Sequence, residues 1–121
     1  MVLLMSVNPG FGGQKYIPYT TQKIRDLKKM MEEKHCQADI EVDGGVSLNN
    51  VQEVLDAGAN IIVAGTAVFK GDIRENVESF LNIMENNSSF ERPLRLLVIE
   101  KFLMMGEAKR YEYVDCDRWK Y

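Results

Sequence analysis

The sequence contains Asn8-Pro9-Gly10-Phe11-Gly12-Gly13-Gln14 after one short apolar run and Glu41-Val42-Asp43-Gly44-Gly45-Val46 at the end of another. A third glycine-bearing junction, Ala64-Gly65-Thr66, follows the run Asn60-Ile61-Ile62-Val63. A segment with helical periodicity comes after each junction. Because backbone N–H groups in such turns can point freely at an anion, the three junctions predict one shared phosphate-binding face. Asp43 adds a carboxylate at a strand end, which is where barrel enzymes keep their catalytic groups.

Three strand–helix units are predicted in residues 1–85. The strands are expected at residues 2–7, 38–42 and 60–64, as short apolar runs of the kind that a parallel sheet buries on both faces. The helices that follow are expected to be capped at Thr20 or Thr21, at Ser47 and at Asp72, and Gly58 is expected to end the second helix.

The alternation of strands and helices with short connections predicts an α/β fold with a parallel sheet. Three strands cannot close the eight-stranded barrel that such units build. We therefore expect the C-terminal part of a larger architecture, whose open sheet edge favours assembly with copies of itself or with a missing N-terminal half.

Residues 86–121 break this pattern. A linker is expected at Asn86-Asn87-Ser88-Ser89, and a helix is expected from Pro93 to Gly106. That helix is apolar nearly all round, which is typical of a buried or partnered helix. The aromatic and charged end, residues 111–121, is interpreted either as an edge strand or as a loose tail, and no role is assigned to residues 86–121.

Composition excludes several classes of protein. The 121 residues are 45% hydrophobic, which is enough for a real core, and the formal net charge is -3 with the basic residues scattered. A nucleic-acid-binding protein needs a clustered positive field, so this class is not expected. No apolar run approaches the roughly 18 residues that span a bilayer. Cys36 and Cys116 lack C-x-x-C spacing, so a reduced, cytoplasmic protein is the simplest interpretation.

The three junctions are specific enough to compare with a family. Residues 5–18 resemble the sixth-strand loop of ribulose-phosphate 3-epimerases, and residues 40–46 resemble their seventh strand. Residues 57–69 resemble the eighth strand, with Thr66 where serine is usual. The resemblance covers about residues 2–84 in the order and spacing of the family.

The resemblance implies a partial (β/α)8 barrel in residues 1–85, with a helical C-terminal extension. It also implies an enzyme that interconverts D-ribulose 5-phosphate and D-xylulose 5-phosphate with a divalent cation (zinc, iron, manganese or cobalt). In the family, the strand-seven aspartate is a metal ligand and an acid–base carboxylate, which corresponds to Asp43. The other substrate-binding residues that the resemblance implies, most of them glycines whose amides would contact the phosphate, are Met5, Gly10, Phe11, Gly12, Gly13, Gly44, Gly45, Gly65 and Thr66.

Epimerisation next to a ketone needs two acid–base groups on opposite sides of a planar enediolate. Asp43 is one such group. The resemblance places a serine, two metal-binding histidines and a second catalytic aspartate on strands one to four, and no segment of this sequence matches those strands. We therefore expect the chain to bind a sugar phosphate without inverting its stereocentre.

Two alternatives remain open at this stage. A sister epimerase, such as one acting on allulose 6-phosphate, would share the phosphate end and the proton chemistry. A non-catalytic module that binds phosphate or mediates assembly would need only the three glycine-bearing turns. Local sequence alone also allows Asp43-Gly44 to be a simple turn and Met5 to be a core residue.

Overall fold

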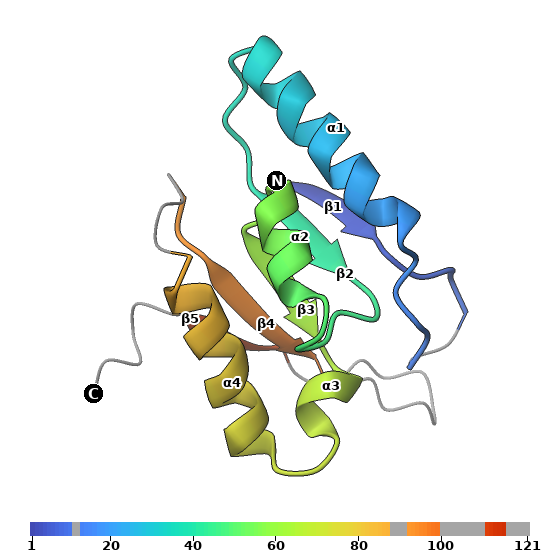
Figure 1. Cartoon of the computed structure of the whole chain (residues 1–121), viewed down its shortest axis with the longest axis vertical. Coiled ribbons are helices and arrows are strands. Elements are labelled where there is room, and N and C mark those ends of the chain that lie inside the picture. The colour runs from blue at the N-terminus through green and yellow to red at the C-terminus, as the bar shows by residue number, and fades with distance from the viewer. Residues whose placement is uncertain (11–12, 88–91, 100–110, 116–121) are drawn as a thin grey trace.

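The computed structural model describes residues 1–10, 13–87, 92–99 and 111–115. A five-stranded sheet runs through these residues in the order β1-β2-β3-β4-β5 (Figure 1). The first four strands are parallel, and β5 is antiparallel to β4. The strands are β1 (Val2–Met5), β2 (Ile40–Asp43), β3 (Ile61–Ala64), β4 (Arg95–Ile99) and β5 (Tyr111–Asp115).

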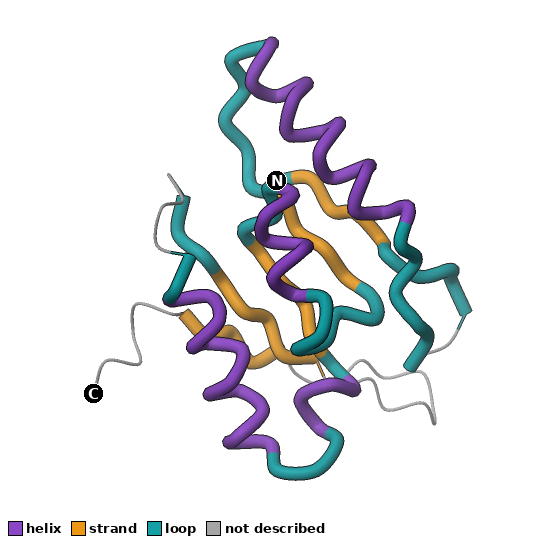
Figure 2. The backbone as a smooth tube through the Cα atoms, viewed as in Figure 1, coloured by secondary structure: helices purple, strands orange, loops and turns teal. Residues whose placement is uncertain are grey.

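The helices lie together on one face of this sheet (Figures 1 and 2). They are α1 (Tyr19–Glu33), α2 (Val51–Ala57), α3 (Thr66–Phe69) and α4 (Ile73–Glu85). The core lies between the helices and the sheet, and every second strand residue points into it: Ile40, Val42, Ile62, Ala64, Leu96 and Val98. Among the described residues, no helix combines the length and the apolar character needed to cross a membrane.

Two helix boundaries confirm the predicted capping, and two differ from it. Gly58 ends α2 at a φ of 119°, and the Asp72 side chain accepts a hydrogen bond of 3.0 Å from Glu75 N at the start of α4. However, α1 begins already at Tyr19, because Pro18 has a φ of -58° that suits a helix start. Thr20 and Thr21 are therefore buried inside its first turn rather than capping it. Likewise α2 begins at Val51, and Ser47 instead accepts a bond from the turn that precedes the helix.

The expectation of strands buried on both faces is correct for β3 and wrong for β1. All four β3 residues are buried, and β3 lies between β2 and β4 inside the sheet. In β1, Leu3 and Met5 are both 48% exposed. The reason is that β1 is an edge strand and that the helices cover only one face of the sheet.

The helix predicted from Pro93 to Gly106 is wrong where the structure describes it. Residues 95–99 form β4, which pairs in parallel with β3, and residues 100–106 lie outside the described part. A short run that is apolar on all sides suits a buried strand as well as a buried helix, and here the free edge of β3 decides in favour of a strand. Of the two interpretations of the tail, the edge strand is confirmed for residues 111–115.

A polar cluster joins three strands at their amino-terminal ends. The Asn60 side chain, which is 3% exposed, accepts a hydrogen bond of 2.8 Å from Ile40 N and donates to Asp39 Oδ1 at 2.9 Å and to Pro93 O at 3.3 Å. Arg92 Nη1 lies 2.6 Å from Asp39 Oδ1. The hydrogen bond from Arg92, and then that from Asn60, lowers the pKa of the Asp39 carboxyl. The cluster therefore fixes the start of β4 to the starts of β2 and β3.

Replacing Asn60 by alanine is expected to lower the free energy of unfolding by about 2 kcal/mol, because the buried Ile40 N–H loses its acceptor. Urea unfolding of the full chain measures this. Asn82→Ala on the exposed side of α4 is the matched control and should change stability by less than about 0.5 kcal/mol. Equal effects of the two substitutions would show that Asn60 does not hold the strands together.

Candidate functional site

The candidate site lies at the carboxyl ends of the first three strands. Met5 pairs with Asp43, and Asp43 pairs with Val63, so one row across the sheet ends β1, β2 and β3 nearly together. Ser6 N continues the ladder with a hydrogen bond of 2.8 Å to Asp43 O. In-register parallel pairing therefore brings the loops after the three strands to one edge of the sheet.

The loop after β2 lies directly on the segment that follows β1. A Cβ atom at Gly44 (φ 126°) would be 2.6 Å from Val7 Cγ2, and one at Gly45 (φ 65°) would be 2.8 Å from Tyr16 Cα. The Ser6 hydroxyl also donates a hydrogen bond to Gly44 O. Only glycine allows both the left-handed backbone and this close approach, so the Gly44-Gly45 pair is needed to join the first two loops.

The loop after β3 approaches the first loop from the other side. A Cβ atom at Gly13 (φ 72°) would be 3.8 Å from Thr66 Oγ1, an ordinary van der Waals distance. Thr66 is exposed and begins the four-residue helix α3 directly after Gly65. Gly10 is exposed with an open surrounding, whereas Phe11 and Gly12 lie outside the described residues. Of the predicted phosphate-binding residues, the structure thus brings Gly13, Gly45 and Thr66 into one loop cluster.

The carboxylates of β2 lie on the face of the sheet that has no helices. Asp43 and Glu41 alternate along the strand with the core residues Ile40 and Val42, and both are half-buried. Burial, and then the nearby charge of Asp43, raises the pKa of the Glu41 carboxyl. Met5 lies on this same face in register with Asp43 and is solvent-exposed rather than part of the core.

Glu41 was not among the predicted site residues, although its spacing of two residues from Asp43 indicates that both side chains lie on one face of the strand. Residues i and i+2 of a strand point to the same face. The run Glu41-Val42-Asp43 therefore places two carboxylates together wherever Val42 is buried. The sequence indicates the strand, and this pairing follows directly from it.

Asp43 is the residue that the sequence predicts as a ligand of a divalent cation at the carboxyl ends of the strands. Aspartate oxygen suits zinc, manganese or iron as a ligand. However, in residues 1–10, 13–87, 92–99 and 111–115, no three His, Cys, Asp or Glu side chains come together in a way that could hold a metal ion. The described residues therefore fit a metal only as a partial site, with Asp43 as the single ligand expected from the sequence.

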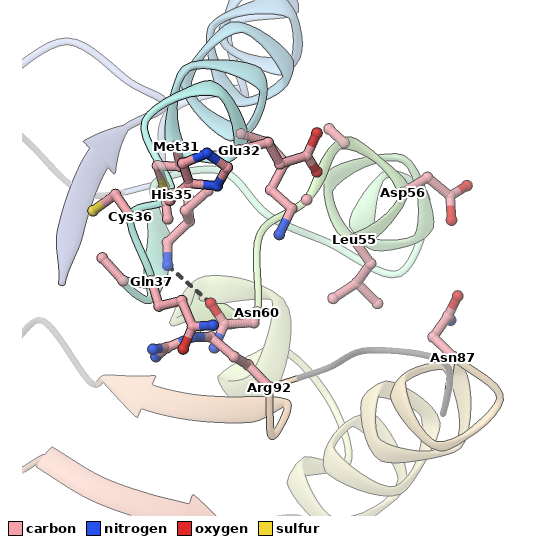
Figure 3. Close-up of a pocket in the computed structure, with 15 residues that line it drawn as sticks. Met31, Glu32, His35, Cys36, Gln37, Leu55, Asp56, Asn60, Asn87 and Arg92 are labelled. Carbon is pink, nitrogen blue, oxygen red and sulfur yellow. Dashed lines mark hydrogen bonds between the residues drawn. The ribbon is translucent and has the colours of Figure 1, made fainter.

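A pocket of about 900 Å³ opens at the opposite, amino-terminal end of the strands (Figure 3). It lies between the ends of α1 and α2 and the Asn60 cluster, and its walls include His35, Cys36, Asp56 and Arg92. Barrel enzymes bind their substrates at the carboxyl ends of the strands. The pocket therefore lies at the end of the strands where barrel enzymes do not bind substrate, and the candidate site remains the loop cluster beside Asp43.

Comparisons with known proteins agree with this placement. The profile of the ribulose-phosphate 3 epimerase family matches residues 1–69, which include all three glycine-bearing loops. The ribulose-phosphate 3-epimerase of Synechocystis sp. is 58% identical over 69 residues, which are 57% of this chain and 30% of the relative. The enzyme of Escherichia coli K12 is 51% identical over 69 residues, 57% of this chain and 31% of the relative.

The chloroplastic ribulose-5-phosphate-3-epimerase of Arabidopsis thaliana is 58% identical over 69 residues, which are 57% of this chain and 25% of that protein. The chain thus spans less than a third of the length of these curated relatives. Residues 70–121 lie outside the matched segment.

The contact between the first two loops makes a stability prediction. Gly45→Ala is expected to destabilise the chain by about 3 kcal/mol, since the added methyl group meets the Tyr16 backbone and the left-handed φ disfavours it. Gly71→Ala is the matched control, because Gly71 has a φ of 89° but open space around it, so that only the backbone strain of about 1 kcal/mol remains. Thermal unfolding of both variants measures the difference; equal losses would mean that the close approach is absent.

Proposed function

Because the chain belongs to the ribulose-phosphate 3-epimerase family, we propose that residues 1–69 form the phosphate-binding part of an epimerase site together with one of its two acid–base groups. The proposed substrate is D-ribulose 5-phosphate, which the complete site would convert to D-xylulose 5-phosphate. The observation that carries the proposal is the meeting of three glycine-bearing loops beside Asp43. A cytoplasmic location remains a prediction.

The phosphate would bind to backbone amides of the loop cluster. Gly13, Gly44 and Gly45 all have positive φ values, which turn their peptide groups in directions that other residues rarely adopt. Concave groups of backbone N–H donors of this kind bind anions without a basic side chain. This fits a chain whose net charge is -3 and whose lysines and arginines are scattered. The Thr66 hydroxyl, exposed beside Gly13, offers a further donor.

Asp43 would remove or return the proton at the carbon next to the ketone. Its carboxyl lies at the end of β2 in the row that also contains Met5, on the face of the sheet that has no helices. A substrate whose phosphate is bound by the loops would therefore lay its sugar carbons over Met5 and Asp43. A divalent cation held in part by Asp43 would supply Lewis-acid stabilisation of the developing enediolate charge when bound.

A single carboxylate cannot complete an epimerisation, because the proton must return from the opposite face. Glu41 lies two residues before Asp43 in β2 and on the same face of the sheet. It therefore does not provide an acid–base group on the opposite side of the substrate. The proposal therefore assigns to this chain one half of the chemistry. A non-catalytic phosphate-binding module is the second candidate, and it would need only the loop cluster that contains Gly13, Gly45 and Thr66.

Phosphate binding can be tested with an added negative charge in the loop cluster. Gly13→Asp is expected to weaken binding of D-ribulose 5-phosphate by about tenfold or more, because the new carboxylate repels the phosphate. Gly71→Asp introduces the same residue at a similar φ, away from the loops, and should leave binding unchanged. Titration followed by NMR measures both; unaffected binding in Gly13→Asp would refute the phosphate site.

Turnover and the role of Asp43 are tested separately. We expect no D-xylulose 5-phosphate from the full chain with added manganese or zinc, and sustained turnover would contradict the assignment of one acid–base group.

Asp43→Asn should abolish the increase in sugar-phosphate affinity that a divalent cation causes, while leaving binding of inorganic phosphate intact. Asp56→Asn, on the exposed side of α2, is the control. If Asp43→Asn changes neither, the module interpretation is favoured; preferential binding of allulose 6-phosphate would indicate the sister epimerase.

A further inference from the structure

The strand β4 pairs with the edge of β3 that, in a closed barrel, pairs with the first barrel strand. In an eight-stranded parallel barrel the last strand pairs with the first, since no edge is left open. The sequence resemblance makes β3 the last barrel strand, and the family match ends at residue 69. Yet β3 already has a parallel neighbour on its outer side, and this neighbour is β4, from outside the matched segment.

We propose that β4 replaces the first strand of the barrel at the outer edge of β3, so that this chain can join a barrel only through β1 unless β4 leaves. The inference rests on the family fold and not on the proposed phosphate site. It concerns a segment to which the motifs of the sequence assign no role.

The pairing of β4 has the orientation and the length that a barrel strand requires. All four residues of β3 have a partner in β4, in the register Ile61–Arg95, Ile62–Leu96, Val63–Leu97 and Ala64–Val98. The two strands are parallel, as neighbouring strands of such a barrel must be. A loosely attached tail would not match the complete edge of β3.

The side chains of β4 belong to the same core as those of β3. Leu96 is 0% exposed and Val98 is 7% exposed, and both lie in one cluster with Ile62, Ala64 and Phe80. Burial of these two apolar side chains therefore stabilises the position of β4. Displacement of β4 without a substitute strand would therefore expose part of the core.

Polar contacts lock the beginning of β4 in place. Arg95 N donates a hydrogen bond of 2.9 Å to Asn60 O, and Asn60 Nδ2 reaches Pro93 O. Arg92 Nη1 contacts Asp39 Oδ1 at 2.6 Å, and Figure 3 shows Arg92 beside Asn60 at the rim of the pocket. Every partner in these contacts outside the β4 segment belongs to the family-matched part of the chain.

Occupation of this edge excludes a further barrel strand there. The N–H and C=O groups along one edge of β3 can pair with a single strand at a time. Beyond β4 the sheet continues with β5, which is antiparallel and cannot extend an all-parallel barrel. The opposite edge strand, β1, has β2 as its one strand partner among the described residues and carries the exposed side chains of Leu3 and Met5.

A pair of introduced cysteines in the full chain tests the position of β4. In a background with Cys36→Ser and Cys116→Ser, the pair Val63→Cys and Leu97→Cys should form a disulfide under mild oxidation, because residues paired on adjacent strands are within the reach of such a bond. The control pair Met5→Cys and Leu97→Cys is separated by three strand spacings, about 14 Å, and should not form one. Absence of the first disulfide, or formation of the second, would overturn the proposal.

Exclusion of the barrel strand is tested in a fusion. The part of the Escherichia coli relative that the family resemblance assigns to barrel strands one to five is joined ahead of Met1 in the chain with Val63→Cys and Leu97→Cys, in order to supply a first strand and a second acid–base group. Molecules in which the two introduced cysteines are joined by a disulfide should have no epimerase activity, and activity should appear only in the fraction without this bond, after reduction. Full activity in the disulfide-bonded fraction would show that β4 and the first strand coexist and would refute the replacement.

Discussion

The in-register parallel pairing of β1, β2 and β3 determines where the described candidate residues lie. Parallel strands end on the same side, and the row Met5–Asp43–Val63 makes these three strands end together. The Gly44 and Gly45 backbone then lies against the first loop, and Gly13 lies beside Thr66. A shift of β2 by one residue would turn Asp43 into the core and Val42 to solvent, since strand side chains alternate between faces. The register is thus the condition for a site at this edge.

The two faces of the sheet carry different kinds of side chain on β2. On the helix face, Ile40, Val42 and their neighbours in β3 and β4 form a continuous apolar core. On the other face, the same strand β2 carries Glu41 and Asp43, which would be costly to bury without partners. Half-burial, and then the charge of Asp43, raises the pKa of the Glu41 carboxyl, because both disfavour its charged form. Core residues and carboxylates therefore alternate along a single strand.

Sequence analysis was most successful where local chemistry decides the structure. The three strand–helix units, the left-handed Gly58 and the Asp72 cap follow from residue preferences within a few positions. The approach of the three loops follows from parallel topology. By contrast, residues 96–99 are apolar at both helical and strand spacing, and the free edge of β3 selects the strand. The contact of Gly45 with Tyr16 is likewise tertiary, and a glycine pair in a turn does not reveal what it approaches.

The order of the strands has a consequence for how fast the chain folds. Strand order in the sheet equals strand order in the sequence, so each strand pairs only with its immediate predecessor and successor. A closed barrel must in addition join its first strand to its last, across the entire chain length, before the sheet is complete. Proteins whose contacts are local in sequence fold faster than those that need distant pairings. This arrangement can therefore assemble progressively from one end, strand by strand, without waiting for a distant segment to arrive.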